Sequence, residues 1–185
     1  QIEDVLTRYQ AEVMPVRTLA ATRQARSTHR FDRGDFLSPA EQVFPTTLSA
    51  LPSPDRPAAN RLDLAKWLVG PSNPLTPRVI ANQFWSRLFG AGLVRSVGDF
   101  GVRGELPSHP ELLDWLAHHY REELRWNTKE FLKTILMSST YRQSSAHRPE
   151  LQEADPLNLW LARQNRLRVE GELVRDLGLQ VAGLL

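Results

Sequence analysis

Cysteine is absent from the 185-residue sequence, and lysine is scarce. Without thiols there can be no disulfide, thiolate metal site, cysteine nucleophile or c-type haem attachment within these residues. Long apolar runs are also missing, since none approaches the roughly 20 residues that a membrane-spanning helix needs. We therefore expect no transmembrane segment here, and the missing thiols leave the redox compartment open.

A marked excess of charge of one sign is lacking as well, because 23 basic residues face 21 acidic ones and the formal net charge is only +2. Only Lys66, Lys129 and Lys133 are lysines, so nearly all the basic residues are arginines, which stay protonated to very high pH. A small arginine excess therefore explains the pI of about 9.3. The charges are interspersed and form no basic block that could follow a phosphate backbone. We expect no nucleic-acid partner.

The histidines lack the spacing of a metal site. No two of them have H-x-H spacing or lie at positions i and i+4, and adjacent histidines point about 100° apart on a helix. We therefore expect no metal site and no cofactor. The five histidines are His29, His109, His118, His119 and His147.

The first third of the sequence has two parts. Residues 1–12 have the apolar spacing of an amphipathic helix, which Pro15 ends. Residues 16–57 are rich in proline, serine, threonine and glycine and have no long apolar stripe, which predicts extended segments with a turn at Gly34. The prolines favour a stiff, irregular strap over a flexible linker.

Helical signals begin at residue 60 and continue to the end of the sequence. Each predicted helix pairs a capping residue with an apolar stripe at helical spacing. Two of the caps are followed by proline in the first turn, where its missing N–H has no effect, and Ser108 with Glu111 has the spacing of a capping box. A last helix is expected over residues 173–184. The predicted capping residues are Asn60, Thr76, Ser108, Thr128 and Asp155.

This pattern predicts a mainly α fold: a bundle-like core of five to six helices with an extended, proline-rich N-terminal strap. We expect residues 1–59 to form the helix tail and the strap, packed on the core, and residues 60–185 to form the core itself. Both ends of the sequence look cut, so we expect the core to continue beyond Leu185. The residues predicted to be buried in mutual contact are Trp67, Phe84, Trp85, Leu88, Leu113, Leu116, Phe131 and Ile135.

Residues 90–105 are the most glycine-rich part of the chain. Glycine permits positive φ angles and close backbone approach. The segment matches neither the phosphate-binding loop nor the dinucleotide fingerprint, because no strand precedes it and no helix begins at the right glycine. We expect a compact loop that side chains from neighbouring helices keep ordered, with a backbone-lined ligand site as the alternative.

One group of polar residues lies within otherwise apolar helical segments. Buried polar groups need partners, so the first interpretation is an internal network in which Asp99 and Asp114 each pair with an arginine. The alternative is an acid–base site that uses His109, Asp99 and Asp114. In either case Arg78, Asn82, Tyr141 and Arg142 are candidate binding residues. The full group is Arg78, Asn82, Asp99, His109, Asp114, Tyr141 and Arg142.

A second polar group lies near the end of the sequence. Basic and acidic residues alternate there at helical spacing, which favours a salt-bridged helix start. The alternative is a binding site for acidic or sulfated sugars, because the guanidinium fork matches oxyanions. The group contains Arg163, Asn165, Arg166, Arg168, Glu170, Arg175 and Asp176.

Several motifs match one family in both order and spacing. They occupy residues 60–68, 73–79, 89–94, 99–101, 109–117 and 139–145. With these motifs the sequence resembles the planctomycete-type domain of unknown function fifteen-fifty-three, from about residue 14 to the end. The resemblance implies a large multidomain protein that is exported or located in the cell envelope, often with a planctomycete cytochrome c domain. It supplies no catalytic residues.

The sequence therefore suggests two functions. The first is a structural or interaction module of a larger multidomain cell-envelope or exported protein, with the other domains of that protein as partners. The alternative is an enzyme domain that acts on polysaccharide through His109 and a carboxylate. A deep pocket that contains this pair would favour the enzyme.

Overall fold

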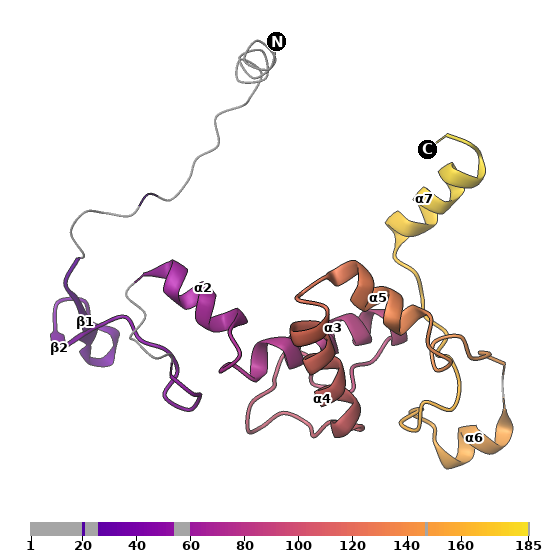
Figure 1. The fold of residues 1–185 in the computed structure, drawn as a ribbon, viewed down its shortest axis with the longest axis horizontal. Helices are drawn as coiled ribbons and strands as arrows, with labels where there is room; N and C mark the ends of the chain where they lie inside the picture. The colour runs from indigo at the N-terminus through magenta and orange to yellow at the C-terminus, as the bar shows by residue number, and fades with distance from the viewer. Residues whose placement is uncertain (1–19, 21–25, 54–59, 147, 185) are drawn as a thin grey trace, which may run out of the picture. The chain divides into compact units, whose positions relative to one another are not determined.

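The computed structural model describes residue 20 and residues 26–53, 60–146 and 148–184. The helix expected over residues 1–12 lies outside the described residues. The chain divides into two units, Gln1–Pro45 and Thr46–Leu185, and each is described by itself. The fold is mainly helical, as predicted, with six α-helices in the described residues (Figure 1).

The first unit contains a β-hairpin. Strand β1 (Thr28–Phe31) pairs antiparallel with β2 (Pro39–Val43). The predicted turn at Gly34 is confirmed, since this residue has φ of 80° at the end of a short 3-10 helix. Arg30 binds the Glu41 carboxylate across the strands with two N–H groups, and this lowers the pKa of Glu41. The pairing itself was not predicted, because both strands are short and mostly exposed.

Helices α2 (Arg61–Val69) and α3 (Leu75–Phe89) begin the second unit. The Asn60 cap is confirmed: its side-chain oxygen accepts the N–H groups of Leu62 and Asp63 at 2.8 and 3.0 Å. The predicted cap at Thr76 is wrong, because α3 already begins at Leu75 and Asn73 supplies the capping oxygen. Asn73 Oδ1 accepts the N–H groups of Leu75 and Thr76 at 3.0 and 3.2 Å. The proline at position 77 already lies inside the helix.

Helix α4 (Pro110–His118) has no capping box. The N-cap is His109, whose side chain makes no capping bond, and Pro110 sets the φ angle of the first turn. The Ser108 N–H donates to the Leu93 carbonyl at 2.8 Å, so Ser108 is bonded to the glycine-rich loop and not to the first turn of α4. The capping role predicted for Ser108 is therefore wrong.

The last three helices are α5 (Thr128–Leu136), α6 (Pro149–Ala154) and α7 (Gly171–Val181). The cap of α5 is Asn127, one residue before the predicted Thr128. The helix start predicted at Asp155 is wrong, because Asp155 follows the end of α6. Its carboxylate accepts the N–H groups of Leu159 and Trp160, both at 2.8 Å, and so closes a turn.

Aromatic and branched apolar side chains from α3, α4 and α5 form the core. Six of the eight residues predicted as core are buried, and Phe84 and Leu88 are partly buried against the same cluster. Trp85 stacks on Phe89 with ring centroids 4.1 Å apart, and Phe84 lies 6.0 Å from Phe131. Trp67 is buried outside this cluster, where its indole N–H donates to the Pro52 carbonyl at 2.9 Å. The core is therefore centred on α3.

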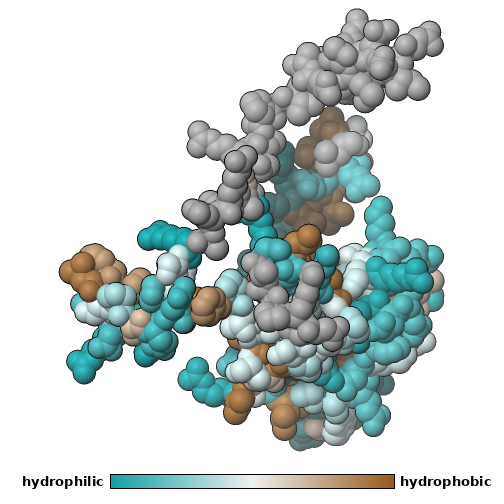
Figure 2. All heavy atoms as spheres, turned by 60° about the vertical axis from the view of Figure 1, so that its left-hand side comes forward, coloured by the Kyte–Doolittle hydropathy of each residue, from teal (hydrophilic) through white to brown (hydrophobic). Residues whose placement is uncertain are grey.

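Helix α7 differs from the helices of the core, because none of its residues is buried. Leu173, Val174, Leu177 and Val181 follow one another at helical spacing, and each is about half exposed or more. Hydrophobic residues also reach the surface in several other groups among the hydrophilic ones (Figure 2). Within the part of the chain that the structure describes, no helix is long and apolar enough to span a membrane.

Candidate functional site

The glycine-rich loop is held by one buried side chain. Asn82 on α3 is 0% exposed; its amide donates to the Val94 carbonyl and accepts the Val94 N–H, both at 2.9 Å. A Cβ on Gly92 would lie 2.3 Å from the Val94 carbonyl oxygen, so only glycine fits at this point. The prediction that a neighbouring helix orders this loop through its side chains is confirmed.

Asp99 does not pair with an arginine. Its carboxylate is exposed and accepts the Gly101 N–H at 2.9 Å within the loop. Among the described residues it takes part in no ion pair, so the predicted Asp99–Arg pair is wrong. The physical reason is local, because an aspartate two residues before a glycine can close a turn with the backbone N–H instead.

Asp114 does pair with an arginine, as predicted. Arg78 Nε donates to Asp114 Oδ1 at 2.6 Å, which ties α3 to α4. The side chains are 36% and 55% exposed, so water competes for this ion pair. Tyr141 packs edge-on against Phe89, with ring centroids 5.5 Å apart. These contacts stabilise the packing of the helices.

The candidate acid–base residues are not joined to one another. His109 Nδ1 lies 3.1 Å from Ser108 Oγ, and no hydrogen bond or ion pair among the described residues links His109 to Asp99 or Asp114. The Arg142 side chain is exposed and has no partner among those residues. The catalytic and binding roles considered for this group stay predictions.

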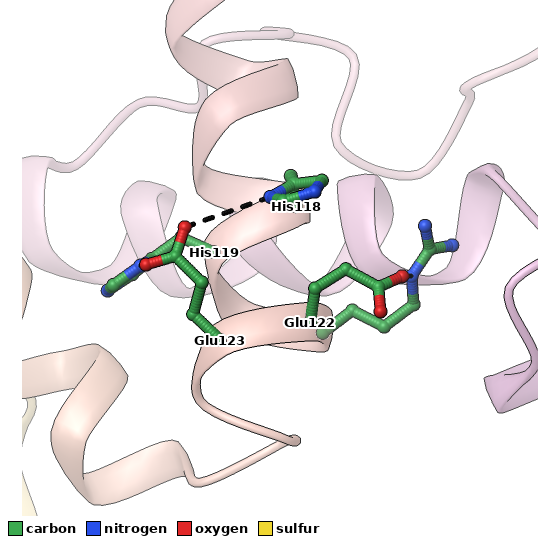
Figure 3. Close-up of polar contacts among 5 residues, drawn as sticks. His118, His119, Glu122 and Glu123 are labelled. Carbon is green, nitrogen blue, oxygen red and sulfur yellow. Dashed lines mark hydrogen bonds and ion pairs between the residues drawn. The ribbon is translucent and has the colours of Figure 1, made fainter.

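A cluster of histidine and glutamate side chains that the sequence did not predict lies where α4 continues as a π-helix, His119–Glu123. The Glu123 carboxylate lies between two imidazole rings (Figure 3): Nδ1 of His119 is 2.9 Å from Oε2, and Nδ1 of His118 is 3.8 Å from Oε1. The His119 ring also stacks on Trp115, with centroids 4.8 Å apart. π-Helical turns are rare and often occur at functional sites.

The π-helix also anchors the start of α3. Arg121 donates to the carbonyls of Pro71 and Asn73, both at 3.2 Å, and its Nε donates to Glu122 at 2.7 Å. The four-residue spacing of His119 and Glu123 was visible in the sequence, but nothing there indicated a π-helix. In the described part of the chain, no group of three or more His, Cys, Asp or Glu residues could hold a metal ion.

A polar cavity of about 270 Å³ lies between the segment before α6 and the segment that leads to α7. Three arginines and two amide side chains line it, and no acidic residue does. A second cavity, of about 240 Å³, is apolar and includes Leu48, Leu51 and Trp67. Neither cavity includes His109, Asp99 or Asp114. The lining of the polar cavity is Ser145, Ala146, Arg148, Pro156, Arg163, Gln164, Asn165 and Arg166.

In α7, Arg175 Nη1 lies 3.7 Å from Asp176 Oδ1, but the salt-bridged helix start predicted from Arg163 onward is wrong for residues 163–170. This segment has no helix, and α7 begins only after it. Arg163 donates to the carbonyls of Leu151, Asp155 and Pro156 in place of a carboxylate. Its charge is thus held in position without being neutralised.

Comparison with known proteins gives one result. Residues 60–185, which are about two thirds of the chain, match the model of a protein family described as PSD1, protein of unknown function (DUF1553). No curated protein and no solved structure matches the chain.

Proposed function

The chain belongs to the DUF1553 family of proteins of unknown function, and from this premise we propose that it is a structural or interaction module of a larger multidomain exported or cell-envelope protein. Its partners are the other domains of that larger protein. The observation that carries the proposal is the exposed apolar stripe of α7.

The stripe has the width that a core-facing helix needs. At 100° per residue, Leu173, Val174, Leu177 and Val181 fall within one arc of about 100°. Leu177 is 54% exposed, and its neighbours on the stripe are about as exposed or more so. An isolated helix of this length is marginal in water, so α7 gains stability when a partner covers the stripe. The family match includes α7, so the helix is part of the family domain.

The positions of the candidate acid–base residues also support a module. His109 pairs with a serine, Asp114 with an arginine and Asp99 with a backbone N–H. None of the three lines either of the two cavities described above, and no hydrogen bond or ion pair among the described residues joins them. Acid–base catalysis requires both groups within reach of one bond.

The test measures binding of this chain to the other domains of the larger protein, produced as a separate polypeptide, by isothermal titration calorimetry. We expect a defined complex. Leu177→Ser should weaken it about tenfold or more, because burial of a leucine contributes about 1.5–3 kcal/mol. Arg175→Ser is the matched control, since Arg175 lies on the opposite side of α7 and arginine and leucine have similar helix propensities.

Two results would overturn the proposal. One is the absence of any complex, with Leu177→Ser and Arg175→Ser indistinguishable from the unchanged chain. The other is cleavage of a polysaccharide by this chain that His109→Ala abolishes and Leu177→Ser leaves intact, which would establish the enzyme instead.

A further inference from the structure

The polar cavity has no role in the interaction described above, and its chemistry is that of a ligand site. We propose that it binds one acidic sugar unit, which carries a sulfate ester or a carboxylate. The inference is independent of the α7 stripe. It rests on Ser145, Arg148, Arg163, Gln164, Asn165 and Arg166, which line the cavity.

The walls are built by side chains that bind the backbone. Arg148 donates to the Ala162 carbonyl at 2.6 Å, and the Gln164 N–H donates to the Ser144 carbonyl at 3.2 Å, so the two segments are joined across the cavity. Asn165 donates to the Phe89 carbonyl at 2.7 Å and ties the wall to the end of α3. These bonds give the cavity a defined shape without any ligand.

The lining carries three arginines and no acidic residue. None of its three arginines forms an ion pair with a carboxylate among the described residues, and Arg166 has no hydrogen-bond partner there at all. The nearby Asp155 carboxylate is already engaged by two backbone N–H groups. Three like charges around one cavity repel each other, and an anion between them removes that repulsion. The guanidinium fork of Arg166 matches the oxygens of a sulfate or carboxylate.

The rest of the lining favours a sugar over a simple anion. Gln164, Asn165 and Ser145 add neutral polar side chains to the lining, and their oxygens are acceptors. An acceptor binds a donor, which an anion lacks and a sugar hydroxyl has. The volume of about 270 Å³ lies just below the range of pockets for drug-sized ligands and suits a single sugar unit.

Two residues between the lining residues Pro156 and Arg163 lie in the left-handed region, Asn158 and Leu161, each with φ of 53°. This conformation is uncommon for leucine. The Asn158 side chain stabilises it, since it accepts the Ala162 N–H at 3.1 Å and donates to the Arg163 carbonyl at 2.8 Å. Backbone held in sparsely populated conformations is concentrated at ligand sites.

The experiment titrates the 185-residue chain with glucose 6-sulfate, glucuronic acid, glucose and sodium sulfate at physiological ionic strength, where exposed charges are screened over about 8 Å. We expect saturable binding of both acidic sugars, weaker binding of sulfate, and none of glucose. Arg166→Gln should lower the affinity for glucose 6-sulfate about tenfold, because it removes one charged hydrogen-bonding group. Arg166 is exposed and unpartnered, so its replacement leaves the fold intact.

Two further variants make the test specific. Arg168→Gln removes an exposed arginine two residues away that does not line the cavity, and it should leave the affinity unchanged. Gln164→Leu should weaken binding of the acidic sugars and spare that of sulfate. Equal losses for Arg166→Gln and Arg168→Gln, or no saturable binding at millimolar sugar, would overturn the proposal. Sulfate that binds as tightly as glucose 6-sulfate would overturn the assignment to a sugar.

Discussion

Two stretches of the second unit, residues 75–136 and residues 148–184, are held together by different kinds of interaction. In the first, the buried residues are mainly large apolar side chains around Trp85 and Phe131. In the described part of the second, the buried residues are Asp155 and Asn158, and both are occupied with backbone groups. The first stretch therefore has a core of its own. The described part of the second has none: Leu161 packs against the core of the first, the other contacts that hold it are mainly polar, and its apolar helix α7 is exposed.

The energetics explain why this difference matters. Burial of one large apolar side chain contributes about 1.5–3 kcal/mol, whereas a typical hydrogen bond contributes a net of about 1 kcal/mol. Global stability therefore depends on the first stretch, and the second can open locally at a smaller cost.

Truncation of a core tryptophan gives the strongest contrast. Trp85 is 4% exposed and Trp160 is 62% exposed. Trp85→Ala should lower the free energy of unfolding by about 3–5 kcal/mol, because it leaves a cavity in the core. Trp160→Ala should change it by no more than about 0.5 kcal/mol. Urea denaturation followed by circular dichroism measures both, and equal losses would remove the distinction between the stretches.

A substitution at Asn82 tests the polar contact between α3 and the glycine-rich loop. Asn82→Ala leaves the N–H and the carbonyl of Val94 without partners, which should cost about 2–3 kcal/mol. Limited proteolysis should then cut faster within residues 90–104. Gln83→Ala, at an exposed neighbouring position on α3, is the control and should leave the cleavage rate unchanged.

A substitution at Asn158 tests the hydrogen bonds that hold the second stretch. Asn158→Ala removes its bonds to Ala162, Arg163 and Asn165 and should favour local opening by about 1–2 kcal/mol. We expect faster proteolysis over residues 155–166 with an unchanged Tm of the core. A Tm that falls as much as it does in Asn82→Ala would show that the two stretches unfold together.

The smallest effects concern helix caps. Asn60→Ala removes two capping bonds of α2 and should cost about 1 kcal/mol. Ser108→Ala should cost less than about 0.5 kcal/mol, since the Ser108 hydroxyl caps no helix. Thermal unfolding measures both variants. A loss of stability in Ser108→Ala equal to that in Asn60→Ala would instead support the capping box that the sequence indicates at Ser108.

The sequence predicted the first stretch better than the second, and the reason is physical. Apolar periodicity records which helix face is buried, so the core of α3, α4 and α5 could be predicted from the spacing of its large side chains. Where polar groups hold the chain, the same signals mislead. Asp155-Pro156 has the form of a helix start, but the carboxylate binds the N–H groups of a turn.

In the candidate sites, too, the sequence indicates which residues are polar but not which partners they bind. Asn82 was recognised as a polar residue on an apolar helix, and it does hold the loop. The Arg78–Asp114 pair joins residues 36 positions apart, and only the packing of α3 on α4 decides which arginine Asp114 meets. The arginine cavity is formed by segments without regular structure, for which the sequence has no periodic signal. The sequence did indicate part of the cavity lining, because Arg163, Asn165 and Arg166 already stood together in the second polar group.

Amide hydrogen exchange of the 185-residue chain tests the division most directly. Amides of α3 should exchange only through global unfolding, whereas those of α7 should exchange through local opening of low free energy. We expect the amides of α3 to be protected several orders of magnitude more than those of α7, and α7 to gain protection when the other domains of the larger protein are added. Protection of α7 equal to that of α3 in the chain alone would contradict it.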